Sequence, residues 1–252
     1  MWLRLGQETY PCESAGPPLP QFPSIVYNAP VSAQAGMDET GLIGTGANWG
    51  TPRREAVDLR VASLFSAAEA RPERVAEVVF VIRRPNGRLL LQTKAFYPPG
   101  AYRLPSGSIT AGEPVLAALW REVAEETSLQ VTLLRFLAVI SYGIVTPESE
   151  SAGPLTRTFT SYVFLLQETG GELCTADEDE RVAGFREVET SELPGVADRL
   201  EALAASADPR LRSWGDWGRF RAVAHRLVWE ILRTEEAPVA DGGPPAAPGP
   251  AK

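Results

Sequence analysis

The sequence predicts an α/β sandwich built on a mixed β-sheet. Along the 252 residues, β-rich runs are interspersed with a few amphipathic segments, an order typical of layered folds that pack helices on a sheet. Hydrophobic residues make up 44% of the chain, which is enough to fill a core between the layers. This length fits one large domain with extensions, or two small domains.

The strands are predicted from β-rich runs that are bounded by turn residues. Residues 75–96, VAEVVFVIRRPNGRLLLQTKAF, hold two such runs around Asn86-Gly87, the strongest short signal for a β-hairpin. Three more runs predict strands over 131–145, 156–168 and 182–189.

Helices are predicted from apolar residues at helical spacing. Residues 53–70 show this spacing, with Pro72 just beyond as a stop signal. A second helix is expected over 113–127, where Pro114 suits the first turn. Two more are expected toward the C-terminus, over 191–205 after a turn and over 214–235 as a long amphipathic helix.

The chain divides into three parts by composition. Residues 1–70 are expected to form an irregular N-terminal extension, rich in Pro, Gly, Ser and Ala up to residue 52, with the helix of 53–70 at its end. The main domain spans 71–235, including the long C-terminal helix. Residues 236–252 are a low-complexity Pro/Ala/Gly tail that is expected to be disordered.

Charge and cysteine content limit the classes of function. The net charge of −8 and the pI of about 4.9 argue against electrostatic binding to polymeric nucleic acid or an anionic membrane. No apolar run reaches the length that spans a bilayer, and the first residues lack the apolar core of a signal peptide. Cys12 and Cys174 are too few for a disulfide framework, so a cytoplasmic, reducing compartment is expected.

His225 is the only histidine in the sequence. A Ser/His/Asp triad or a Cys/His dyad would depend on it, and a zinc site of His and Cys ligands is nearly excluded. Because His225 lies within the predicted helix 214–235, we interpret it as structural or exposed. Catalysis is therefore expected to rest on carboxylates, lysines or a hard metal ion held by oxygen ligands.

The predicted helix 113–127 brings three glutamates together. Each helical residue turns by about 100°, so Glu122, Glu125 and Glu126 share one sector as i, i+3 and i+4. Five residues of the adjoining sector are expected to face the core: Leu116, Leu119, Trp120, Val123 and Thr127. Crowded carboxylates repel each other, and a divalent cation such as Mg²⁺ or Mn²⁺ would offset that repulsion. The alternative interpretation is a solvated charged face.

Three neighbours extend this candidate metal site. Arg121 can reach Glu125 at i+4 and orient its carboxylate. Gly107 lets the backbone come close, so that its carbonyl can serve as a further hard ligand. Glu113 stands at the helix entrance, where it can reach the metal region through water or cap the first turn.

The spacing of these residues resembles the signature of the Nudix hydrolases. That signature runs Gly, five residues, Glu, seven residues, then Arg-Glu-apolar-any-Glu-Glu-any-Gly-apolar. Eight positions match it: Gly107, Glu113, Arg121, Glu122, Val123, Glu125, Glu126 and Leu129.

Two serines depart from the family pattern. Ser128 replaces the closing glycine, and as a left-handed helix C-cap it is expected to cost about 1 kcal/mol. The usual Pro-Gly-Gly before the signature reads Pro105-Ser106-Gly107, so Ser106 is expected to alter the loop slightly.

The resemblance implies a fold, a reaction and a ligand set. The fold is a Nudix-type α/β/α sandwich with the signature as a loop-helix-loop under the mixed sheet. The reaction is Mg²⁺-dependent hydrolysis of a nucleoside diphosphate linked to another moiety. By position, Glu122, Glu125 and Glu126 are implied metal ligands together with the Gly107 carbonyl, and Arg121 orients a glutamate. Glu122 is the first candidate for the general base.

Residues outside the signature are further candidates for the site. Many family members add a carboxylate from a later loop, and the segment ADEDERVAG offers Glu178 and Glu180 among its acidic residues. Its alternative interpretation is a solvated acidic turn. Lys94 and Arg103 flank the glycine loop as candidates for contact with substrate phosphates, or as surface charges.

Two tyrosines and the N-terminal extension complete the predictions. Tyr97 and Tyr102 are candidates for stacking on a base, or for loop packing. The expected partner is a small nucleotide-type molecule, with a lean toward nucleotide sugars and ADP-ribose. The alternative function is a non-catalytic Nudix module that binds a nucleotide as a sensor or scaffold. For residues 1–70 three roles stay open: covering the sheet, forming homodimer contacts, or remaining disordered.

Overall fold

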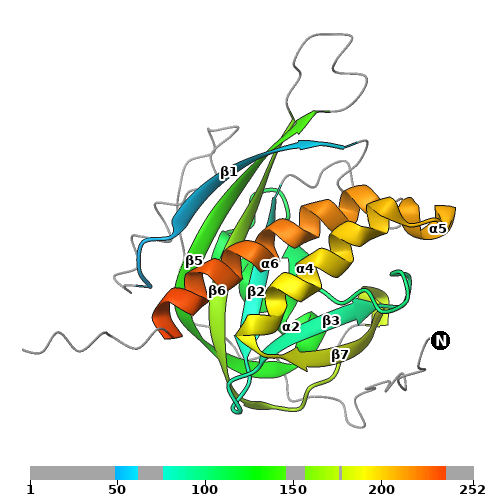
Figure 1. Ribbon diagram of the computed structural model, residues 1–252. Helices are drawn as coiled ribbons and strands as arrows, with labels where there is room; N and C mark the ends of the chain where they lie inside the picture. The colour runs from blue at the N-terminus through cyan, green and yellow to red at the C-terminus, as the bar shows by residue number, and fades with distance from the viewer. Residues whose placement is uncertain (1–48, 62–75, 146–156, 176–177, 237–252) are drawn as a thin grey trace, which may run out of the picture.

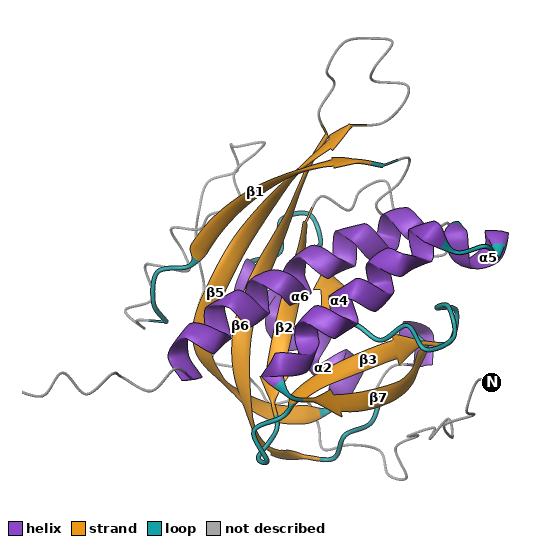
Figure 2. Ribbon diagram, in the orientation of Figure 1, coloured by secondary structure: helices purple, strands orange, loops and turns teal. Residues whose placement is uncertain are grey.

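The computed structural model is an α/β/α sandwich (Figure 1). It describes residues 49–61, 76–145, 157–175 and 178–236. A mixed sheet lies between two helical layers, as Figure 2 shows. Helices α4 (Leu193–Glu201) and α6 (Gly215–Glu236) cover one face, and α2 (Val115–Thr127) covers the other. We call these the α6 face and the α2 face. The predicted fold class is confirmed.

The sheet has seven strands in the described part of the chain. Six run in the order β1-β5-β6-β2-β3-β7, and β4 pairs with β2 off this path. The pairs β1–β5 and β2–β6 are parallel, and the others are antiparallel. The strands are β1 (Arg53–Arg60), β2 (Ala76–Arg83), β3 (Leu89–Lys94), β4 (Ser106–Ser108), β5 (Leu129–Val145), β6 (Arg157–Gly171) and β7 (Val182–Val188).

Most elements lie where the sequence predicts them. The hairpin of β2 and β3 turns at Gly87, whose φ of 85° is the left-handed conformation that favours glycine. The predicted strands and the helices at α2, α4 and α6 are all present. Shorter helices complete the described chain: η1 (Glu178–Glu180), η2 (Thr190–Glu192), η3 (Ala202–Ala205) and α5 (Pro209–Arg212).

The helix predicted over 53–70 is wrong for its first part. Residues 53–60 form strand β1, which pairs in parallel with β5 from Arg53–Ala138 to Arg60–Val145. The reason is a period of two: Val57 and Leu59 are half-buried, whereas their neighbours are exposed. Residues 62–75 lie outside the described residues, as do 1–48 and the predicted tail 237–252.

Two hydrophobic cores pack on the two faces of the sheet. The central strand β2 contributes to both, with Val79 and Val81 on the α6 face and Val78, Phe80 and Ile82 on the α2 face. This continuous apolar run is typical of a strand that is buried on both sides. The two layers fix β2, and β2 in turn fixes β4, which carries the glycine loop of the signature.

Two further observations concern the cysteines and the membrane. Cys174 is buried, and Cys12 lies outside the described residues. Among the helices that the structure describes, none combines the length and the apolar character needed to cross a membrane.

Candidate metal centre and active site

Helix α2 carries the glutamates of the signature, and its end is set by Ser128. The helix stops there because Ser128 has φ 55° and ψ 11°, the left-handed conformation, and its N–H donates to the Ala124 carbonyl. The predicted left-handed C-cap is therefore confirmed. A serine in place of glycine at such a position costs about 1 kcal/mol.

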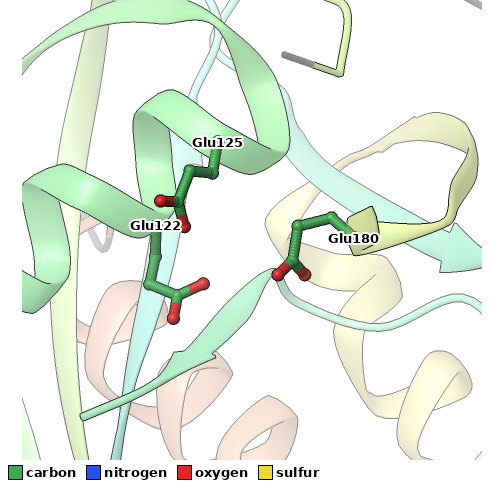
Figure 3. A group of neighbouring side chains, drawn as sticks. All are labelled: Glu122, Glu125 and Glu180. Atoms are coloured by element: carbon green, nitrogen blue, oxygen red, sulfur yellow. The ribbon is translucent and has the colours of Figure 1, made fainter. Parts of the chain in front are cut away.

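Three carboxylates from two elements converge beside α2. Carboxylate oxygens of Glu122, Glu125 and Glu180 all lie within 4.8 Å of one another. Glu122 and Glu125 come from α2, and Glu180 comes from η1 just before β7 (Figure 3). A donor set of carboxylate oxygens without nitrogen or sulfur fits a hard divalent cation such as Mg²⁺ or Mn²⁺.

Gly107 leaves the space that the Glu122 carboxylate occupies. A Cβ at position 107 would lie 1.7 Å from Cδ of Glu122 and 2.0 Å from its Oε2. No side chain fits there, so the glycine is required by close approach rather than by its backbone angles. Because β4 is paired to β2, Glu122 rests on backbone that the sheet holds in place.

Arg121 orients two of the three carboxylates. Its Nη1 donates to Oε1 of Glu122 at 2.9 Å and to Oε2 of Glu125 at 3.1 Å. Its Nη2 donates to the Ser108 carbonyl at 2.9 Å. The guanidinium thus ties α2 to the end of β4 and holds the carboxylates in one orientation, as outer partners of metal ligands do.

Glu113 faces Arg121 and not the three converging carboxylates. It accepts two bonds from Arg121, Nε to Oε1 at 2.8 Å and Nη2 to Oε2 at 2.9 Å, and one from the Thr110 N–H at 2.9 Å. Burial alone would raise the pKa of Glu113, but the bonds from Arg121 outweigh burial and lower it. In this arrangement both oxygens of Glu113 bond Arg121, so Glu113 is linked to Glu122 and Glu125 through that guanidinium.

Glu126 is buried behind the three converging carboxylates. Its residue is 0% exposed; Oε2 accepts from Gln92 Nε2 at 2.8 Å, and Oε1 lies 2.9 Å from Lys94 Nζ. Lys94 Nζ also lies 2.6 Å from Oε2 of Glu180. Burial would lower the pKa of Lys94, but the charges of Glu126 and Glu180 raise it above its usual value. Lys94, predicted to contact phosphates, thus links two carboxylates.

The Glu122 carboxylate is surrounded by more negative than positive charge. Burial first, and the Glu126 carboxylate second, raise the pKa of Glu122 to about 7 although Arg121 acts in the opposite direction. Like charges held this close favour protonation. A bound cation would reverse that shift by stabilising the ionised carboxylates.

Arg103 does not lie at the converging carboxylates. It is 1% exposed and donates to Tyr97 Oη at 2.8 Å, to the Leu104 carbonyl at 2.8 Å and to Ser106 Oγ at 3.0 Å. The prediction of a phosphate contact is corrected, since buried acceptors on the α6 face take the guanidinium. Tyr97 is buried and packs against Trp217.

Neither Tyr102 nor Glu178 belongs to the group of converging carboxylates. Tyr102 is partly buried against the core of the α6 face, which fits the alternative of loop packing. Glu178 begins η1, the helix that ends with Glu180. Of the two predicted loop carboxylates, Glu180 is the one grouped with the α2 glutamates.

A second polar cluster lies on the α6 face, and the sequence did not indicate it. Ser106 Oγ accepts from Arg103 and from Arg221, both at 3.0 Å, and donates to Glu77 Oε2 at 3.3 Å. Arg221 Nη1 donates to Glu77 Oε2 at 2.8 Å, and Ser161 Oγ donates to Oε1 at 2.8 Å. We call these five residues the α6-face network. One signal was available, since Glu77 is the only charge within the apolar run of β2 that ends at Arg83.

His225 joins α6 to the glycine loop beside that network. Its Nε2 accepts from the Leu104 N–H at 3.0 Å, which makes Nδ1 the protonated nitrogen that donates to the Arg221 carbonyl at 2.8 Å. His225 is 1% exposed. Its role is structural, as the sequence predicts, and together with Ser106 it anchors the segment that leads to Gly107.

Comparison with known proteins supports the assignment of the signature. A family model described as NUDIX domain matches residues 72–211. The chain belongs to the Nudix hydrolase family. Strand β1 and helix α6, which carries Arg221 and His225, lie outside the matched residues.

Individual relatives are similar over part of their length. An ADP-ribose pyrophosphatase of Methanocaldococcus jannaschii is 32% identical over 117 residues, which cover 46% of this chain and 63% of the relative. Among solved structures, a UDP-X diphosphatase is 16% identical with a TM-score of 0.41, covering 67% of this chain and 68% of that one. An ADP-ribose pyrophosphatase of Streptococcus suis is 18% identical with a TM-score of 0.38, covering 64% and 92%.

Proposed function

We propose that this Nudix protein is a Mg²⁺- or Mn²⁺-dependent hydrolase that cleaves the diphosphate of a nucleoside diphosphate linked to another moiety. The observation that carries the proposal is the convergence of Glu122, Glu125 and Glu180 oxygens within 4.8 Å. This convergence lies in the signature of a family of hydrolases, beside the close approach of Gly107.

Each residue of the centre has a separate task in this proposal. Glu122, Glu125 and Glu180 would hold the divalent ion, which when bound neutralises diphosphate charge and lowers the pKa of water. Arg121 keeps Glu122 and Glu125 in place through its paired bonds. Glu122 is also our candidate for the group that takes a proton from the attacking water, because its carboxylate belongs to the converging group where the ion would activate that water.

ADP-ribose is the first substrate to test. The reason is the similarity to the Methanocaldococcus jannaschii protein named ADP-ribose pyrophosphatase. Nucleotide sugars share its chemistry, a nucleoside diphosphate joined to a sugar, and belong in the same panel with dinucleoside polyphosphates, nucleoside triphosphates and NADH.

Glu125→Gln tests the proposal with little risk to the fold. The Glu125 side chain is 33% exposed and pairs with Arg121 at the surface, so the isosteric amide should leave stability nearly unchanged. Losing one metal-binding oxygen should lower kcat/KM by about 100-fold or more. The measurement is release of AMP from ADP-ribose with Mg²⁺ or Mn²⁺, beside a thermal melt. Glu189→Gln, on an exposed carboxylate that pairs with Arg88, is the matched control.

The competing function is nucleotide binding without chemistry. Calorimetry that detects a bound nucleotide, together with no turnover of the whole panel in either metal, would replace the hydrolase with the sensor or scaffold. Turnover that Glu125→Gln abolishes decides for the hydrolase.

A further inference from the structure

We propose that the ammonium of Lys94 takes the place of a second divalent ion in the metal centre, because it occupies the position between Glu126 and Glu180 that such an ion would need. On this proposal the centre takes a single ion, on the side of Glu122, Glu125 and Glu180. The inference rests on the proposed function, since it concerns the same centre.

The position of Lys94 follows from strand β3. Alternate residues of a strand point to the same face, so Gln92 and Lys94 both reach the α2 face at the end of β3. They meet the same carboxylate: Gln92 Nε2 lies 2.8 Å from one oxygen of Glu126, and Lys94 Nζ lies 2.9 Å from the other. Glu126 is fully buried, and the protein supplies a hydrogen bond to one of its oxygens and an ion pair to the other.

Lys94 also connects this buried carboxylate to the three converging ones. Its Nζ lies 2.6 Å from Oε2 of Glu180, and Glu180 is grouped with Glu122 and Glu125, whereas Glu126 is not in that group. A single ammonium therefore bridges Glu126 and Glu180, as a metal ion shared by two carboxylates would.

The charges of the centre agree with one ion. Arg121 bonds Glu113 twice and Glu122 and Glu125 once each, whereas Glu126 and Glu180 are both contacted by the ammonium of Lys94. A second divalent ion between Glu126 and Glu180 would have to displace that ammonium, or lie beside it and be repelled. Removing the charge of Lys94 should therefore allow a second divalent ion to bind, whereas replacing Lys94 by another cationic residue should not.

Manganese titration of the full chain tests this inference. Free Mn²⁺ is followed by electron paramagnetic resonance, for the wild type and for Lys94→Met, which keeps the length of the side chain and removes its charge. The wild type should bind one Mn²⁺ per chain; Lys94→Met should bind a second, or bind the first at least about tenfold more tightly. Lys94→Arg keeps the charge and should behave as the wild type. Arg88→Met removes a charge from an exposed ion pair and serves as the control.

The outcomes separate this inference from the proposed function. A wild type that binds no Mn²⁺ overturns both. A wild type that binds two or more ions, or a folded Lys94→Met with unchanged or weaker binding, overturns the role of Lys94 and leaves the hydrolase intact. If Lys94→Met does not fold, Glu126→Gln decides: it should still bind one Mn²⁺ with near wild-type affinity, and a loss of binding would make Glu126 a ligand and refute the proposal.

Discussion

Two polar clusters lie on opposite faces of the same sheet, and they differ in charge balance and in access to water. On the α2 face, Glu125 and Glu180 have side chains that are 33% and 27% exposed, and carboxylates outnumber cations. On the α6 face, every member of the network is 4% exposed or less, and its one carboxylate, Glu77, is accompanied by two arginines, of which Arg221 pairs with it directly. An open, unbalanced cluster is suited to take a ligand, whereas a closed, bonded one is suited to hold structure.

The glutamates Glu77 and Glu122 show the same difference between the two faces. Glu77 and Glu122 are both buried and both pair with an arginine on a helix. Glu77 accepts from Arg221, Ser106 and Ser161, a complete set of donors. Glu122 instead faces other carboxylates, which raise its pKa together with burial. Burial of a charge alone does not mark a functional site; burial among like charges does.

Arg221→Met should have the largest effect on stability. The substitution leaves Glu77 as a buried charge without its ion-pair partner, which costs about 3–5 kcal/mol, and it removes a bond to Ser106. The measurement is the free energy of unfolding in urea. The double variant Glu77→Met/Arg221→Met should lose less than the single one, because no charge stays buried. Equal losses from Arg221→Met and from Arg88→Met on the exposed pair with Glu189 would contradict a structural network.

His225 should make the stability of the α6 face depend on pH. Burial, and then the charges of Arg103 and Arg221, lower the pKa of His225 to about 4, whereas the unfolded chain keeps about 6.5. As pH falls below 6.5 the unfolded state binds the proton first, so the free energy of unfolding declines until about pH 4. The slope is at most about 1.4 kcal/mol per pH unit, or about 3 kcal/mol in all.

A non-titrating side chain isolates this contribution of His225. His225→Gln should be less stable at pH 7, but its stability should fall less than that of the wild type between pH 6.5 and 4. Subtracting the two pH curves from urea unfolding removes the contribution of the carboxylates. Parallel curves would mean that His225 is not buried in the neutral form.

The site could be predicted from sequence where its geometry is local. Glu122 and Glu125 are one turn apart on a helix, so helical periodicity alone brings them together. The hairpin at Gly87 is equally local. The end of α2 at Ser128 was also predictable, because the glycine that the family signature has at this position is expected to take the left-handed conformation of a helix C-cap.

The parts that sequence did not reveal depend on pairing across the chain. Glu77 and Arg221 are 144 positions apart, and β1 pairs with a strand that follows it by about 80 residues. In β1, the alternation of Val57 and Leu59 with charged residues competes with a helical pattern of similar strength. The place of Arg103 also depends on α6, because Arg103 shares its acceptor Ser106 with Arg221, which lies 115 positions from that serine.

Gly107→Ala separates function from stability on the α2 face. The new Cβ would lie 1.7 Å from Cδ of Glu122, so the carboxylate must move, and a shift of about 1 Å in a catalytic group can cost about 100-fold in rate. The moving atoms are the end of a flexible side chain, so the free energy of unfolding should change little. Hydrolysis rate, Mn²⁺ affinity and urea unfolding are measured together. Gly195→Ala, where the nearest atom would be 3.6 Å away, should keep full activity. A Gly107→Ala protein that is destabilised but fully active when folded would show that Gly107 supports the fold and that Glu122 does not need this position.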